Sequence, residues 1–264
     1  MFRRGVGRVL ASAAGVQLCA TAMCLSDKEL AKKPDWYKKE VIELEESLKR
    51  LGRHGYTWSP SALQKSYESL KKFSDFSHVE VLWRLARACV EKAGFSKCPK
   101  EKAHLLHEGL DYAKKALSLE GDTQSAGAHK WYAIALLKLQ DLEKKADRSA
   151  DIIKHLEMAC NLDRRDAYAA HLLGVSHYEK KNYAEALSFF EKAEQIKERF
   201  SIRNLYYIGL VQHATGKKEE AIKTFIAAYR SHPQNECDVD ARFQAKTKLM
   251  KLKVKPEEYE VEDY

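Results

Sequence analysis

Histidine, cysteine and lysine are the residue types of this sequence that could act as catalysts, metal ligands or anion-binding groups. His171 and His177 are six residues apart, so one helix would not present both on the same face, as a spacing of four would. The six cysteines are scattered, with no Cys-x-x-Cys pair and no Cys/His cluster, so we expect no zinc site. The sequence has no glycine-rich phosphate loop and no signature of a nucleophilic triad. We therefore predict that the protein is not an enzyme and needs no cofactor.

The charge balance indicates what kind of partner this chain suits. Its 264 residues carry a formal net charge of +8, with a pI near 9.0. A basic chain suits an acidic partner: nucleic acid, an anionic membrane or an acidic protein. Because no nucleic-acid-binding module and no basic patch interleaved with aromatic residues can be recognised, we expect no nucleic acid. The scattered cysteines suit a reducing compartment.

A lysine run near the C-terminus is the densest basic segment. We take five lysines as a candidate basic patch: Lys246, Lys248, Lys251, Lys253 and Lys255. Residues 254–264 then become acidic, and we expect this acidic tail to be disordered. Two interpretations stay open, because the lysines could bind an anionic surface or could be a solvated helix face that the tail screens.

A repeat positions the rest of the chain. Thirty-five residues separate two matching sets, which are Leu173, Gly174, Ala186, Phe190, Ala193 and Ile208, Gly209, Ala221, Phe225, Ala228. Such a period is typical of the tetratricopeptide repeat, a pair of antiparallel helices. Small residues stand where the two helices approach closely, and large apolar residues fill the space between successive pairs. We predict an all-α fold, a right-handed superhelix of tetratricopeptide-like helix pairs.

Weaker copies and flanking helices complete the predicted organisation. Leu82, Leu85 and Ala86 open one earlier copy, and Trp131, Ile134 and Ala135 open the next. We expect further helices at 36–51 and 60–73, and a capping helix with a polar outer face at 239–252. The predicted boundaries are 1–26 for a targeting or anchor segment, 27–58 for a linker and N-terminal helix, 59–253 for the repeat domain and 254–264 for the tail.

The first helix of each pair lines the concave surface of such a stack. Counting from the small position of each copy gives six candidate groove residues: Trp83, Arg87, Tyr132, His171, Tyr178 and Tyr206. A groove of aromatic and aliphatic side chains suits an amphipathic helix, an extended segment or a lipid chain. The alternative is that these aromatic side chains, Trp83 and Trp131 above all, pack between helices as core.

Residues 1–26 differ in composition from the rest of the chain. Arg3, Arg4 and Arg8 stand in a stretch without an acidic residue, and its apolar residues can share one helix face. That pattern is typical of a mitochondrial targeting segment. A weak membrane anchor, another signal and a disordered basic start are the alternatives.

Three segments resemble the regulator of microtubule dynamics protein family over roughly residues 60–235. They are Val81–Ala88, Ala128–Ile134 and Ala186–Gln195. The resemblance implies a non-enzymatic adaptor that holds a protein partner in its groove and associates with microtubules, tubulin being the acidic partner. It implies a mitochondrial location, or alternatively the cytoplasm, spindle microtubules and spindle poles. The alternatives are a lipid-binding or lipid-transfer module, or an assembly factor, at mitochondria.

Overall fold

The described residues of this chain fold into helices and turns. The computed structural model describes residues 31–75, 78–143 and 147–260, and it contains no strand within these ranges. The predicted segment 1–26 lies outside them. The chain divides into two compact units, residues 1–162 and 163–264, and each is considered by itself. The all-α prediction is confirmed, whereas the right-handed superhelix and the predicted boundaries stay predictions.

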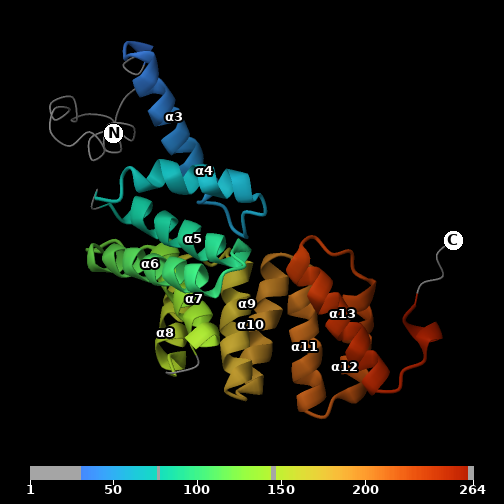
Figure 1. Ribbon diagram of the computed structural model, residues 1–264. Coiled ribbons are helices and arrows are strands. Elements are labelled where there is room, and N and C mark those ends of the chain that lie inside the picture. Colours follow the sequence, from blue (N-terminus) through green and yellow to red (C-terminus); the bar gives the residue numbers. More distant parts are fainter. Residues whose placement is uncertain (1–30, 76–77, 144–146, 261–264) are drawn as a thin grey trace. The chain divides into compact units, whose positions relative to one another are not determined.

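Consecutive helices of the first unit pack against one another in chain order, and α3 meets α4 at a steep angle (Figure 1). They are α3 (Asp35–Arg50), α4 (Pro60–Lys71), α5 (Val79–Phe95), α6 (Pro99–Ser118), α7 (Ala126–Glu143) and α8 (Ser149–Leu162). Ser59 begins α4 as predicted, since its hydroxyl accepts from the amide of Ala62 and Pro60 takes the first helical position. The predicted helices at 36–51 and 60–73 thus appear with ends shifted by one or two residues.

The second unit contains the two copies of the strongest repeat. Its helices are α9 (Ala167–Glu179), α10 (Tyr183–Ile196), α11 (Ile202–Ala214), α12 (Lys218–Arg230) and α13 (Glu236–Lys251), followed by the short 3-10 helix η1 (Pro256–Glu258). A Cβ atom added at Gly174 would lie 2.6 Å from the ring of Phe190, and one at Gly209 would lie 2.5 Å from the ring of Phe225. The small positions therefore stand where the paired helices touch, as the repeat predicts.

The turns inside these two pairs have the same backbone geometry. Lys181 and Gly216 occupy equivalent positions in the two copies and have φ angles of 62° and 84°. In each turn the next amide donates back to a helix carbonyl, Asn182 to His177 and Lys217 to Gln212, both at 2.9 Å. This is the left-handed helix ending that glycine favours. The first copy forms it with a lysine.

Two expectations for the C-terminal end were wrong. The outer face of α13 is not polar throughout, because Val239, Phe243 and Met250 are exposed there. The tail is ordered as far as residue 260: Tyr259 is 2% exposed, and its ring packs edge-on against Tyr229 at 5.5 Å. The acidic composition of the tail gave no indication that Tyr259 is buried, and its burial holds the segment against α12.

Candidate functional site

Trp83 and Arg87 of α5 are both buried in the first unit. Trp83 is 7% exposed, and a Cβ atom at Gly127 would lie 2.6 Å from its ring, so the ring packs against the start of α7. Arg87 is 2% exposed and donates to a carboxylate oxygen of Glu91 at 2.8 Å and to the carbonyl of Leu51 at 3.0 Å. Burial raises the pKa of Glu91, and the charge of Arg87 opposes that shift. The hydrogen bonds of Arg87 therefore hold the segment that follows α3 against helix α5.

Tyr132 lies half-buried between α7 and α8, beside two histidines. Its hydroxyl donates to Asp151 at 3.2 Å, and its ring centroid is 4.4 Å from that of His155. The Nδ1 atoms of His129 and His155 share a hydrogen bond of 2.7 Å. Burial, and to a smaller extent the neighbouring His129, lower the pKa of His155 to about 4. His155 is accordingly neutral at physiological pH.

His171 of α9 is buried in the second unit and joins α9 to α11. Its Nδ1 atom lies 2.9 Å from Oδ1 of Asn204. The Asn204 amide already donates to the carbonyl of Phe190 and to Glu194, so Oδ1 is the acceptor and Nδ1 of His171 carries the proton. Burial lowers the pKa of His171 to about 3, and the charge of Arg203 acts in the same direction. The imidazole is thus a neutral interhelix link.

Tyr178 and Tyr206 belong to a cluster of tyrosines on α9 and α11. Tyr206 is 9% exposed and contacts the ring of Phe225 at 5.8 Å. Tyr178 is half-buried, with ring contacts to Tyr183 at 5.8 Å and to Tyr207 at 5.5 Å. Tyr132 in the first unit and Tyr178 in the second therefore offer more surface to a partner than the other predicted groove residues.

The five predicted lysines do not lie along one helix face. At about 100° per residue, Lys246 stands on a different side of α13 from Lys248 and Lys251, while Lys253 and Lys255 follow the helix. The ammonium of Lys246 lies 2.9 Å from Glu260, and this hydrogen bond raises its pKa. Lys251, Lys253 and Lys255 are exposed. The ordered tail therefore pairs with the first lysine of the run.

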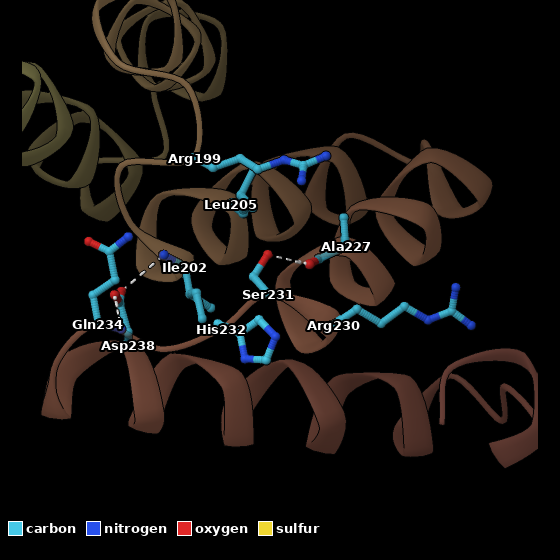
Figure 2. A pocket seen from close by; sticks show the side chains of 9 residues that line it. All are labelled: Arg199, Ile202, Leu205, Ala227, Arg230, Ser231, His232, Gln234 and Asp238. Carbon is cyan, nitrogen blue, oxygen red and sulfur yellow. Dashed lines mark hydrogen bonds between the residues drawn. The ribbon is translucent and has the colours of Figure 1, made fainter. Parts of the chain in front are cut away.

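A pocket of about 440 Å³ opens where α11, α12 and the start of α13 meet (Figure 2). Ile202, Leu205 and Ala227 supply apolar surface. Its remaining lining residues are polar or charged: Arg199, Arg230, Ser231, His232, Gln234 and Asp238. In the view of Figure 2 the guanidinium groups of Arg199 and Arg230 extend to the side opposite Asp238 and Gln234.

The carboxylate of Asp238 is already occupied by hydrogen-bond donors. One oxygen accepts from the amide of Ile202 at 2.9 Å and from the hydroxyl of Ser201 at 3.0 Å, and the other accepts from the amide of Gln234 at 3.3 Å. Arg230 donates to the carbonyls of Tyr259 and Glu258, both of which are neutral acceptors. The pocket therefore presents cationic groups beside an apolar floor, which is chemistry suited to a carboxylate-bearing ligand.

A family model described as "Regulator of microtubule dynamics protein 1-3" matches residues 54–183 and 176–253. The chain belongs to this family. The protein of that name from Bos taurus, regulator of microtubule dynamics protein 1, is 34% identical over 194 residues, which cover 64% of this chain and 60% of the bovine protein. The mouse protein 1 is 32% identical over 212 residues, covering 70% of this chain and 69% of the relative. The match thus spans less than two thirds of the bovine relative.

Solved structures share the fold of this regulator of microtubule dynamics family member. A thermophilic TPR protein of Thermus thermophilus superposes with a TM-score of 0.54 at 15% identity, covering 80% of this chain and 99% of that one. YrrB, described as a TPR protein with an unusual peptide-binding site, superposes with a TM-score of 0.52 at 17% identity, covering 79% of this chain and 93% of its own. These similarities establish a tetratricopeptide-type fold.

The pocket of this family member was not predicted from the sequence. Arg199 and His232 lie in turns outside the repeat pattern. Asp238 lies near the start of α13, where an acidic residue is common because it stabilises the helix N-terminus. Asn204 was also missed, although an asparagine among the apolar residues of a predicted helix was a signal for a buried hydrogen bond.

Neither a membrane-spanning helix nor a metal-binding cluster is found in the part of the chain that the structure describes. No helix there combines the length and the apolar character needed to cross a membrane. No group of three or more His, Cys, Asp or Glu side chains in those ranges is arranged to hold a metal ion. Cys89 and Cys160 are buried within α5 and α8.

Proposed function

We propose that this chain is a non-enzymatic adaptor that associates with microtubules and holds a protein partner on its repeat helices. Membership of the regulator of microtubule dynamics family supports microtubule association, and the tetratricopeptide-type fold supports protein binding, since such helix arrays usually form binding surfaces. The observation that carries the proposal is the cationic pocket of the second unit in a chain of net charge +8.

Tubulin is the acidic partner in this proposal. The acidic tails of tubulin have carboxylates that can bind Arg199 and Arg230. Their flexible backbone can adapt to an open pocket. Lys251, Lys253 and Lys255 are exposed basic side chains of the same unit and extend the basic surface along the chain. Attraction of this kind steers association and weakens with salt, because exposed charges are screened over about 8 Å at physiological ionic strength.

Co-sedimentation with microtubules tests the pocket. Arg199→Gln combined with His232→Gln should lower the affinity several-fold, while Lys223→Gln, which removes an exposed charge on α12, should change it little. Arg230 is left intact because it holds the C-terminal segment through two carbonyls. Equal losses in both variants would show that net charge alone governs binding and would refute the role of the pocket.

A second experiment tests the lysine run. Replacing Lys251, Lys253 and Lys255 with Gln should reduce co-sedimentation and flatten its dependence on salt. Glu260→Gln should strengthen binding, because it releases Lys246 from its ion pair while leaving Tyr259 in place. Unchanged binding in both variants would exclude the lysine run as a contact and confine the interaction to other surfaces of the chain.

One partner-binding surface is proposed in each unit, around Tyr132 in the first and around Tyr178 in the second. Both are half-buried, so each offers an aromatic surface without unfolding its helix. A photo-crosslinking residue at Tyr132 or at Tyr178 should capture a specific protein from cells, and one at the exposed Lys223 should not. Capture of the same set of proteins at all three positions would contradict a defined site.

The polar rim of the pocket in Figure 2 suits a carboxylate better than an acyl chain, so we do not favour the lipid-binding alternative.

A mitochondrial location is proposed from residues 1–26 alone. A fluorescent reporter fused to this segment should reach mitochondria, because the segment is basic and acid-free. Exchanging Arg3, Arg4 and Arg8 for Glu should abolish the targeting. A reporter that stays diffuse in the cytosol would leave the cytoplasm and spindle microtubules as the proposed location.

A further inference from the structure

The outward face of α13 carries an apolar stripe that nothing in the described chain covers. Val239, Phe243 and Met250 are 53%, 71% and 61% exposed. At about 100° per residue, these three positions fall within about 40° of one another around the helix. The opposite face is buried in the core of the second unit through Ala241, Ala245 and Leu249. The stripe is therefore a separate surface of the same helix.

A lysine on this face does not interrupt the stripe. Lys246 stands between Phe243 and Met250, but its ammonium lies 2.9 Å from Glu260 and 5.5 Å from the ring centroid of Tyr229. The charge is thus drawn toward α12 and the C-terminal segment. The alkyl stem of Lys246 remains to contribute apolar surface, as long basic side chains commonly do.

The charges beside the stripe change sign along the helix. Asp240 lies on one flank in the N-terminal half, and Lys251 lies on the same flank about three turns later. Both side chains are exposed. The stripe therefore has an acidic end and a basic end on one flank.

We propose that this stripe binds the same stripe of a second copy of the chain, with the two α13 helices antiparallel about a two-fold axis. Rotation about this axis brings the same flank of both helices to the same side of the pair, and it makes the two helices run in opposite directions. Val239 of one copy then lies opposite Met250 of the other, the two Phe243 rings flank the axis, and Asp240 of each copy lies beside Lys251 of the other. A parallel two-fold pair would place this flank beside the opposite flank of the partner helix, so only the antiparallel arrangement pairs Asp240 with Lys251.

The size of the surface sets the expected strength of this dimer. One helix pair buries less than the roughly 1,600 Å² of a standard protein–protein interface. We therefore expect a weak dimer whose population depends on concentration, held by Phe243 at its centre and given its register by the flanking charges.

Sedimentation equilibrium of the full chain across a range of concentrations tests the proposal. The native chain should show a reversible monomer–dimer equilibrium. Phe243→Glu should raise the dissociation constant at least about tenfold, because a charge is then buried at the centre of the interface. Phe95→Glu is the matched control, since Phe95 is 43% exposed on α5 of the first unit and should leave the equilibrium unchanged. Circular dichroism verifies that both variants are folded.

A charge exchange tests the antiparallel register. Asp240→Lys alone and Lys251→Glu alone should each weaken self-association, because each places like charges side by side in its own homodimer. An equimolar mixture of the two variants should form a heterodimer about as stable as the native dimer, since every flank contact is then of opposite sign. A native chain that is monomeric up to its solubility limit, or a mixture that shows no recovery, overturns the proposal. Both outcomes are read without microtubules and so do not depend on the proposed function.

Discussion

Asn204 and Asp238 are buried polar side chains whose hydrogen bonds connect neighbouring helices of the second unit. Asn204 is fully buried and bonds to His171, Phe190 and Glu194, while the carboxylate of Asp238 accepts from four backbone or side-chain groups of the preceding segments. A buried polar group is tolerated only when its partners are all present, because an unpaired one costs about 1–3 kcal/mol. These two residues therefore impose one register on the helices around them.

At this scale the pKa of His171 predicts a dependence of stability on pH. Its pKa is near 3 in the folded chain and near 6.5 when the chain is unfolded, so below pH 6.5 the unfolded state binds the proton more readily. Stability is retained above pH 6.5 and is lost as the pH falls from there toward 3. The second unit should lose about 2 kcal/mol between pH 7 and pH 5 through this one group.

Hydrogen exchange of the amides of α9 and α11 at the two pH values measures this loss. His171→Asn is the comparison, because the Asn amide can still donate to Asn204 but does not titrate. The variant should be less stable at pH 7 and should show a smaller change between pH 7 and pH 5. The same pH dependence in both chains would mean that His171 is not the group responsible.

At the scale of elements, the pairs α9–α10 and α11–α12 each depend on a glycine at the point where the two helices approach most closely. Gly174 and Gly209 each face the ring of a phenylalanine, Phe190 or Phe225, that is fully buried. Ala186, Ala193, Ala221 and Ala228 are buried as well, in the second helices of the two pairs. The two copies therefore pack alike because the same size of residue recurs at the same place.

Gly209→Ala tests this packing. The added methyl group would lie 2.5 Å from Phe225, so the ring or the backbone must move, and we expect a destabilisation of about 1–3 kcal/mol, reduced in part by the better helix propensity of alanine. Gly94→Ala is the matched control, because no atom lies within 4 Å of its added Cβ. Thermal unfolding followed by circular dichroism should show opposite shifts for the two variants. A Gly209→Ala chain as stable as the native one would contradict the close approach.

At the scale of the whole molecule, the chain consists of two compact units whose unfolding can be followed by different signals. All four tryptophans precede residue 163, so tryptophan fluorescence follows the first unit alone. The second unit ends in a segment that packs back onto α12, through Tyr259 against Tyr229 and through the backbone carbonyls that Arg230 binds. The C-terminal end thus contributes to the core of its own unit.

Tyr259→Ala should destabilise the second unit by about 2–4 kcal/mol, the range for removing a large buried side chain. Amides of α12 and α13 should exchange faster with solvent, and tryptophan fluorescence should be unaffected. Glu257→Ala, an exposed change two residues away, is the control and should leave exchange as it is. Unchanged exchange in the Tyr259 variant would show that the segment does not support α12 and α13.

The period of the sequence by itself determines the pairing of the helices in the second unit. Residue sizes repeat at fixed spacing, and helix pairing depends on size and spacing, so the small positions at Gly174 and Gly209, the tight turns at Lys181 and Gly216 and the all-α class could all be predicted. Helix ends such as Ser59 followed because capping is a local interaction. The family resemblance likewise rested on local segments of sequence.

Tertiary structure alone decided which side of each helix is covered. His171 and Arg87 stand at predicted groove positions, yet both are buried, because Asn204 and Glu91 supply hydrogen-bonding partners that no local pattern reveals. The pocket gathers Arg199, His232 and Asp238 from turns and helix ends, and the exposed stripe on α13 exists because the chain adds no further helix there in the described residues. Exposure depends on what packs against a residue, and that information is distributed over segments far apart in the sequence.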